Sequence, residues 1–247
     1  MFTLVIRAAG ERTAERCRQM VLREVPEEDV HVVELVPFEE ALRECYRIGM
    51  ESGKKWMITI DADVLPRRSF SKKLMKLSAR VNPNILMYNG YVHDKLLMKR
   101  RRAGFRVYNT SHLAEAFSHI PENGATLRPE SHIINCMLER GYEKQNFNYV
   151  MGIHDYHQYY RDIYRKSFLH ASKHEKQITS LTNAWEKAST KDPDFKVAIR
   201  AAADGLSLPV QAKTDATMYD EYAAKALQDL GLREKDEMKK FVHWRWF

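Results

Sequence analysis

The sequence is poor in the residues that form flexible linkers and covalent cross-links. Its 247 residues include 10 Gly, 8 Pro and 3 Cys. So little Gly and Pro argues against long linkers and low-complexity segments. The cysteines (Cys17, Cys45 and Cys136) are odd in number, and no two have the CxxC spacing of many zinc sites. Disulfide and zinc frameworks are therefore unsupported, and a reducing, cytoplasmic environment is expected.

Long apolar runs are missing as well. The apolar residues 2–6 are too few for a signal peptide, and Arg7 follows them. No run approaches the roughly 20 residues needed to span a bilayer. We therefore expect a soluble protein, attached at most peripherally to the inner face of a membrane. A hydrophobic content of 44% is typical of a globular core.

Positive charge exceeds negative charge. Lys and Arg number 40 against 33 Asp and Glu, a formal net charge of +7. Such a surplus attracts nucleic acid, acidic lipid headgroups or phosphorylated small molecules. A well-solvated surface explains the same surplus equally well.

The first 90 residues alternate short apolar runs with amphipathic segments. The pattern predicts strands at 2–7, 30–36 and 56–60, and helices at 14–25 and 38–52. Strands and helices that alternate with short connections form βαβ units around a parallel sheet. The fold class expected is therefore α/β, with a Rossmann-like, mostly parallel sheet.

Later elements follow the same periodicities. They are predicted at 67–80, 85–92, 129–140, 145–153 and from 156 past 170. Beyond about residue 177 the pattern is helical and charged. This suggests a catalytic α/β domain at 1–155 and a helical C-terminal extension at 156–247.

The strongest chemical signal is Asp61-Ala62-Asp63, which follows the third predicted strand. Ligands of open α/β sheets bind at the carboxyl ends of the strands. Two carboxylates there suit Mg²⁺ or Mn²⁺, which bridges to ligand phosphates. The structural alternative is a pair of aspartates that form a turn.

The order βαβαβ followed by Asp-x-Asp resembles glycosyltransferases of the A-type fold, especially family 2. The resemblance covers about residues 1–155 and includes Val36–Leu42, the strand Trp56–Asp63 and a later His. In that family Asp-x-Asp binds a divalent metal and the diphosphate of a nucleotide-sugar. The resemblance thus implies a hexosyltransferase-type, inverting enzyme that takes a UDP- or GDP-sugar and a saccharide or lipid-linked acceptor.

The resemblance also implies roles for individual residues. Asp63 becomes the main metal ligand, and Asp61 faces the ribose or helps to hold the metal. The nucleotide is lined by the first strand and its loop and, near the base, by the end of the second strand. These cofactor-binding positions are Arg7, Ala8, Ala9, Glu34, Asp61, Ala62 and Asp63.

A His after a strand often completes the metal site in this fold, which makes His154 the third ligand. Asp155 then orients the other ring nitrogen or binds substrate. A His that caps the next helix or packs in the core is the alternative.

The acceptor base of family 2 lies near the start of a helix, as Glu130 does in Arg128-Pro129-Glu130-Ser131. The family commonly has a paired acidic motif there, whereas this chain has one acidic residue followed by Ser. An acidic residue favoured by the dipole of the first helical turn is an equally good interpretation.

Three basic segments remain open. Lys95–Arg106 suggests either a phosphate clamp or a solvated loop. Tyr159–Lys166 suggests either an acceptor-binding stripe or tyrosines packed on the sheet. His243–Phe247 suggests membrane-surface contact, or docking on the protein itself or in a homodimer.

Other functions compete with glycosyl transfer. A nucleotidyltransferase that makes nucleotide-sugars usually has a glycine-rich phosphate loop, and Arg7–Arg12 matches it only faintly. A basic nucleic-acid-binding protein is allowed by the charge, but no zinc finger or RNP motif supports it, so no nucleic-acid partner is expected. A non-catalytic, transferase-like domain is the fourth alternative, and retention of Asp61 and Asp63 argues mildly against it.

Overall fold

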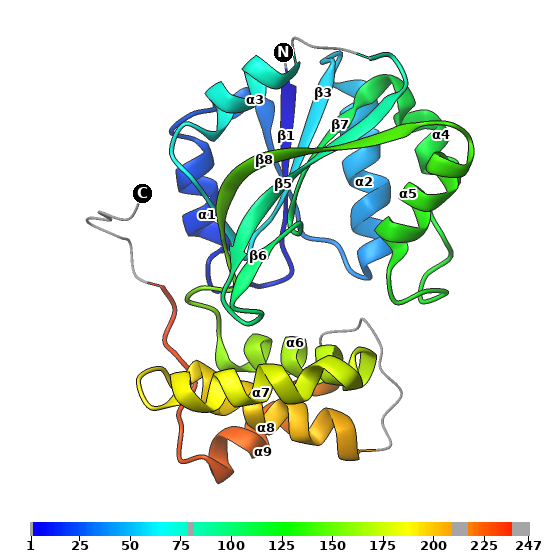
Figure 1. The fold of residues 1–247 in the computed structure, drawn as a ribbon. Coiled ribbons are helices and arrows are strands. Elements are labelled where there is room, and N and C mark those ends of the chain that lie inside the picture. The colour runs from blue at the N-terminus through cyan, green and yellow to red at the C-terminus, as the bar shows by residue number, and fades with distance from the viewer. Residues whose placement is uncertain (1, 79–81, 209–216, 239–247) are drawn as a thin grey trace. The chain divides into compact units, whose positions relative to one another are not determined.

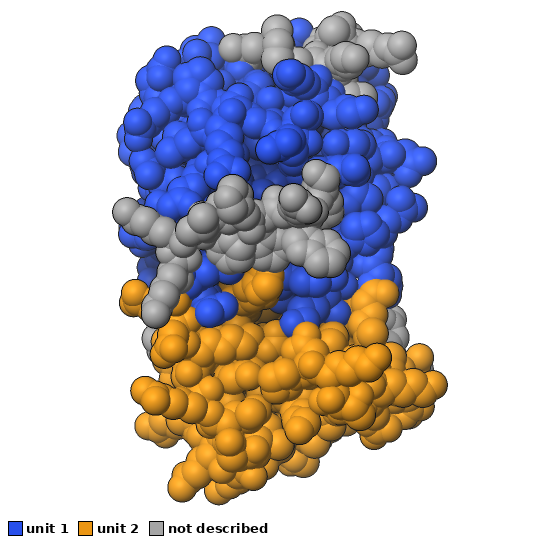
Figure 2. Space-filling view, turned by 90° about the vertical axis from the view of Figure 1, so that its left-hand side faces the viewer, with its two compact units in different colours: residues 1–95, 99–156, 238–247 blue, residues 96–98, 157–237 orange. Residues whose placement is uncertain are grey.

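A computed structural model describes residues 2–78, 82–208 and 217–238. The chain forms two compact units (Figures 1 and 2). The first contains residues up to 95 and 99–156, and the second contains 96–98 and 157–237. The domain boundary at 155/156 stays a prediction.

The first unit is built on one eight-stranded sheet with the order β2-β1-β3-β7-β5-β8-β4, and β6 pairs with β5. Five strands run in one direction, and β4, β6 and β7 run against them. The strands are β1 Phe2–Arg7, β2 Val30–Val33, β3 Trp56–Asp61, β4 Val64–Pro66, β5 Ile85–Asp94, β6 Lys99–Arg101, β7 Phe105–Asn109 and β8 Glu143–His154.

Helices cover both faces of this sheet. Figure 1 shows α1 and α3 on one face, and α2, α4 and α5 on the other. The helices are α1 Ala14–Val21, α2 Phe38–Glu51, α3 Phe70–Ser78, α4 Leu113–Ser118 and α5 Pro129–Glu139, with short 3₁₀ turns at Glu27–Asp29 and Thr110–His112. Each face has its own core, because side chains alternate along a strand: Leu4 and Ile6 join one core and Val5 joins the other.

The predicted α/β class is confirmed, and the first half of the sheet is parallel as expected. The second half is mixed because β7 returns antiparallel between β3 and β5. The short strands β4, β6 and β7 were not predicted from the sequence. Strand β2 ends at Val33 rather than at residue 36.

The second unit is helical. It comprises α6 Tyr160–Lys173, α7 Glu175–Ser189, α8 Asp194–Ser207, a 3₁₀ turn at Thr217–Tyr219 and α9 Asp220–Asp229. Helix α6 begins four residues later than predicted, because Asp155 and His157 have positive φ angles and turn the chain after β8. The carboxylate of Glu234 accepts hydrogen bonds from the backbone N–H groups of Tyr160 and Arg161, which anchors the segment after α9 to α6.

Candidate metal centre

Asp61 and Asp63 have different surroundings although one residue separates them. Asp61 ends β3, and its Oδ1 accepts a hydrogen bond from Arg7 Nε at 2.7 Å and lies 2.6 Å from Arg7 Nη2. Asp63 precedes β4, and its Oδ1 lies 3.5 Å from His154 Nε2. The first carboxylate is therefore neutralised by a fixed cation, whereas the second faces a potential metal ligand.

Asp63, His154 and Asp155 form a cluster of buried ligand groups. Each offers one atom, and these atoms lie within 4.8 Å of one another. Asp155 Oδ2 lies 2.9 Å from His154 Nδ1, so the two ring nitrogens face different carboxylates. A His that binds metal through one nitrogen and donates its other N–H to a carboxylate has this arrangement.

Asp94 joins this cluster and was missed by the sequence analysis. It is the last residue of β5 and the register partner of His154 on β8. Its Oδ2 lies 3.0 Å from His154 Nδ1 and 2.8 Å from Arg101 Nε. The available signal was its position two residues after the predicted strand 85–92, at the edge where Asp61 also lies.

The charge balance of the cluster favours a cation. Burial lowers the pKa of His154, but the nearby carboxylates of Asp155 and Asp63 raise it, and the result is a pKa of about 10. Without a metal, the ring is therefore a cation among carboxylates. A metal that binds Nε2 must displace that proton. Carboxylate oxygens with one imidazole fit Mn²⁺ or Mg²⁺, and the imidazole favours Mn²⁺.

Gly104 brings the backbone close to this centre. Its φ is +63°, and a Cβ added to it would lie 2.6 Å from Val64 Cγ2, 3.3 Å from Asp61 Oδ2 and 3.4 Å from His154 Cδ2. Its carbonyl oxygen also accepts a hydrogen bond from the Asp61 N–H at 2.9 Å. Only glycine combines this conformation with this close approach. Its neighbours in the sequence do not distinguish it from the other glycines.

Glu130 lies in a second buried cluster. Its Oε1 accepts hydrogen bonds from Arg7 Nη1 at 2.9 Å and from the Tyr108 hydroxyl at 2.7 Å, and its Oε2 pairs with Arg106 Nη1 at 2.7 Å. Burial raises the pKa of Glu130, whereas the positive charges of Arg106 and Arg7 lower it. The lowering effect is the larger one, so the pKa falls below the usual 4.5. A general base works best with a pKa near the working pH. The base role of Glu130 stays a prediction, and this geometry favours an anchoring role.

The basic segment Lys95–Arg106 does not form one clamp. Arg101 pairs with Asp94, and Arg106 pairs with Glu130. Arg100 and Arg102 instead lie over the ring of Tyr91, at 5.4 and 5.8 Å from its centroid.

The other predicted nucleotide-binding residues differ in their exposure and in their contacts. Ala62 is buried, and its backbone holds the end of β3: its N–H donates to Arg7 O, and its O accepts from the Thr13 hydroxyl. Ala8 is buried and donates to Val33 O, whereas Ala9 is exposed. Glu34 is exposed, outside both clusters, and lines a groove of about 730 Å³ between β2 and α2.

The structure bears on one of the two remaining open segments. Tyr160 and Tyr164 are buried in the core of the helical unit, which favours packing over acceptor binding for the aromatic stripe. The predicted aromatic segment His243–Phe247 lies outside the described residues. Within the described residues, no helix has the length and apolar character needed to cross a membrane.

Comparisons with known proteins give distant structural similarities. No protein-family model and no curated protein matches the chain. A mannosyltransferase of Pyrobaculum calidifontis in complex with GDP-mannose and Mn²⁺ is 15% identical, with a TM-score of 0.46 over 93% of this chain and 74% of that one. A glycosyltransferase involved in glycosylation of the major capsid of PBCV-1 is 13% identical, with a TM-score of 0.42 over 62% of this chain and 82% of that one.

A CMP:2-keto-3-deoxy-manno-octonic acid synthetase complexed with CTP is also similar. It is 11% identical, with a TM-score of 0.35 over 59% of this chain and 88% of that one. Because identities are low and TM-scores lie below 0.5, these similarities identify no activity for this chain.

Proposed function

We propose that this chain is a metal-dependent glycosyltransferase that holds a nucleoside-diphosphate sugar at the carboxyl edge of its sheet. One observation carries the proposal: ligand atoms of Asp63, His154 and Asp155 converge within 4.8 Å beside the end of β3. Such a buried group of carboxylates and imidazole suits a divalent cation, and divalent cations commonly bind proteins and substrate phosphates together.

The metal would be held by Asp63 and by His154 Nε2, and Asp155, whose Oδ2 lies 2.9 Å from His154 Nδ1, would orient the ring. Asp61 would add a further carboxylate to the site, and its Oδ1 is already paired with Arg7. When bound, the metal neutralises charge that develops on the departing diphosphate. Asp94 orients the His154 ring through Nδ1, and Arg101 in turn holds Asp94.

The nucleotide lies over the end of β1. Arg7 supplies a buried guanidinium beside the diphosphate, and the backbone of Ala8 and Ala9 lines the site. The base extends toward Glu34, which directly follows β2. This arrangement accommodates a UDP- or GDP-sugar.

The acceptor hydroxyl must lose its proton to a base. If Glu130 is that base in an inverting reaction, it must exchange one of its arginine partners for the acceptor during turnover. A Glu130→Gln protein that folds and retains full transfer activity would contradict this assignment without affecting the metal site.

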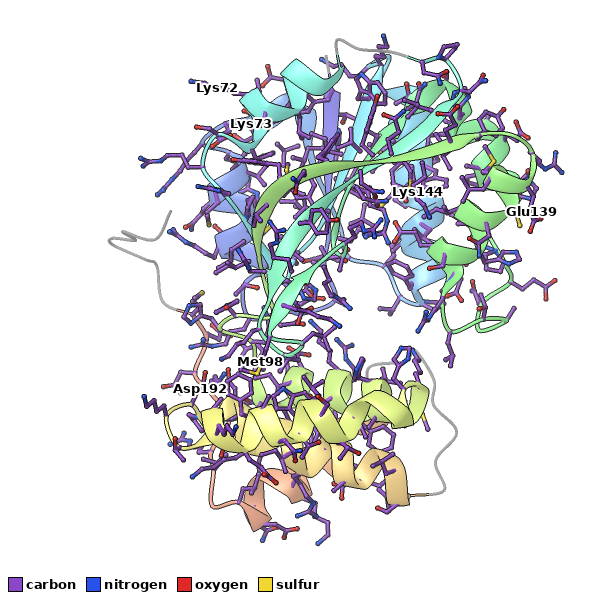
Figure 3. The ribbon with its side chains drawn as sticks, viewed as in Figure 1. Lys72, Lys73, Met98, Glu139, Lys144 and Asp192 are labelled. Atoms are coloured by element: carbon purple, nitrogen blue, oxygen red, sulfur yellow. The ribbon has the colours of Figure 1, made fainter. Side chains whose placement is uncertain are left out.

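Calorimetry tests the donor site. UDP, GDP, CDP and dTDP are titrated into the wild type, each with and without Mn²⁺, and then into Asp63→Ala. We expect one diphosphate to bind in a metal-dependent way and Asp63→Ala to abolish that binding. Glu139→Ala is the matched control, because Glu139 is exposed on α5 (Figure 3) and touches neither cluster.

Failure of all four diphosphates to bind, or undiminished binding by Asp63→Ala, would refute the proposed donor site. The same proteins are also incubated with nucleoside triphosphates and sugar phosphates. Release of pyrophosphate there would favour the nucleotidyltransferase alternative instead.

A further inference from the structure

The two faces of the hairpin formed by β5 and β6 carry different chemistry. In the ladder, Val92 pairs with Arg101 and His93 pairs with Arg100. Neighbouring residues on a strand point to opposite faces. Arg101 accordingly reaches Asp94 on the metal side, while Arg100 and Arg102 lie over Tyr91 on the other side.

The face that bears Tyr91 continues inward along the sheet. Asn89 lies two residues before Tyr91 on β5, and its register partner on β7 is Arg106. These positions therefore share one face. We call the set Asn89, Tyr91, Arg100, Arg102 and Arg106 the Tyr91 face.

The Tyr91 face has an excess of positive charge. It carries three guanidinium groups, and the carboxylate that pairs with one of them, Glu130 at 2.7 Å from Arg106, is shared with Arg7. The charges of Arg100 and Arg102 lie over the ring of Tyr91. Guanidinium groups bind phosphate oxygens through paired hydrogen bonds, so this face complements a phosphate group.

Along the Tyr91 face, the side chains become more exposed from Asn89 toward Arg100 and Arg102. Asn89 is buried and Arg106 is largely so, Tyr91 is half-buried, and Arg100 and Arg102 are exposed. A ligand thus meets two exposed cations first, then an aromatic ring, then a buried amide and a largely buried guanidinium. The ring offers apolar surface with a polar hydroxyl, which suits the mixed surface of a sugar.

We propose that the Tyr91 face binds the acceptor, and that this acceptor is a saccharide bearing a phosphate group. The inference rests on the proposed function, because it needs the donor diphosphate to lie at the metal centre. Arg101 and Asp94 belong to that centre, and Arg106 of the Tyr91 face shares Glu130 with Arg7, so the Tyr91 face adjoins the proposed donor site through Glu130.

The test measures binding of glucose 6-phosphate, glucose and inorganic phosphate by calorimetry at low salt, with EDTA to keep the metal centre from binding phosphate. The variant is Arg100→Gln/Arg102→Gln. The matched control is Lys72→Gln/Lys73→Gln, which removes two exposed charges from α3, on the other side of the sheet (Figures 1 and 3). Thermal unfolding confirms that each protein is folded.

We expect the wild type to bind glucose 6-phosphate and not glucose. Arg100→Gln/Arg102→Gln weakens that binding about tenfold or more, as loss of charge-assisted hydrogen bonds predicts, and the α3 control changes it less than about twofold. Tyr91→Ala weakens glucose 6-phosphate binding more than inorganic phosphate binding, because only the sugar uses the ring.

The proposal would be overturned if glucose 6-phosphate binding weakened equally in both double variants. It would also be overturned if glucose 6-phosphate showed no saturable binding to the wild type. Tight, steeply salt-dependent binding of a single-stranded oligonucleotide that needs Arg100 and Arg102 would also overturn it and assign the face to nucleic acid.

The diphosphate titration separates this result from the donor site. Metal-dependent diphosphate binding that is retained in Arg100→Gln/Arg102→Gln supports two distinct sites. Its loss in that variant would place the arginines in the donor site and overturn the proposal. If the wild type binds glucose 6-phosphate but no diphosphate, the proposed function fails while the phosphate site stands.

Discussion

Two buried carboxylate clusters lie at the same edge of the sheet, and they differ in the charged groups that surround the carboxylates. Glu130 is surrounded by two fixed cations, Arg7 and Arg106, and by the Tyr108 hydroxyl. In the other cluster, three carboxylates surround His154, and Arg101 pairs with one of them, Asp94.

The difference separates a cluster that is complete from one that still favours a cation. A buried ion pair with both partners present leaves little reason for an ion to bind. The Asp63 cluster instead brings ligand atoms of two carboxylates and an imidazole within 4.8 Å of one another, an arrangement that suits a divalent ion. The comparison therefore assigns stability mainly to the Glu130 cluster and ligand binding mainly to the Asp63 cluster.

Glu130→Gln is expected to give the largest effect. It leaves Arg7 and Arg106 buried without their carboxylate, and breaking such a pair costs about 3–5 kcal/mol of unfolding free energy. Urea denaturation measures the loss, with Glu139→Gln as a surface control expected to stay within about 0.5 kcal/mol. A loss of unfolding free energy below about 1 kcal/mol in Glu130→Gln would contradict the assignment of stability to the Glu130 cluster.

Asp63→Asn should weaken metal binding strongly while changing stability little. We expect Mn²⁺ to bind at least about 100-fold more weakly, or about 2.7 kcal/mol, because a charged ligand is lost. Stability without metal should change little, since one of several crowded carboxylates is removed. Mn²⁺ titration followed by electron paramagnetic resonance measures the first quantity, and urea denaturation in EDTA measures the second. A large loss of stability with unchanged Mn²⁺ affinity would reverse the assignment.

Asp94→Asn tests the positioning role of the residue behind His154. Loss of a carboxylate that orients a metal-binding imidazole typically weakens metal affinity about 10–100-fold. The same Mn²⁺ titration measures it, and Asp94→Glu should recover part of the affinity. Unchanged affinity in Asp94→Asn would remove Asp94 from the centre.

Gly104→Ala should give the smallest effect. A left-handed conformation costs a non-glycine residue about 1–2 kcal/mol, and the new methyl group would also crowd Val64 at 2.6 Å. Gly53→Ala is a matched control, because Gly53 has φ +64° but no atom within 4 Å of the added Cβ. Denaturation of both variants isolates the contact: Gly104→Ala should lose more stability and also weaken Mn²⁺ binding. Equal losses with intact Mn²⁺ binding would show that Gly104 does not shape the centre.

The first half of the fold could be predicted from sequence because its signals are local. The apolar run of β1 and the helical period of α2 lie close to their predicted ranges. Asp61 and Asp63 stand out because they follow a buried strand directly. The strands β6 (Lys99–Arg101) and β7 (Phe105–Asn109) are only three and five residues long, and their pairing with β5 gives no local pattern.

The sequence by itself determined the α/β class, the position of the paired aspartates and the candidate status of His154, since each depends on residues that are neighbours in the chain. Only the tertiary structure decided that Arg7 neutralises Asp61, that Asp94 supports His154 and that Glu130 lies between two arginines. Those partners are 54, 60 and 123 residues apart for Arg7–Asp61, Asp94–His154 and Arg7–Glu130. The physical reason is that charge balance in a buried site depends on which strands the sheet places side by side, and strand pairing over such separations leaves no periodic trace in the sequence.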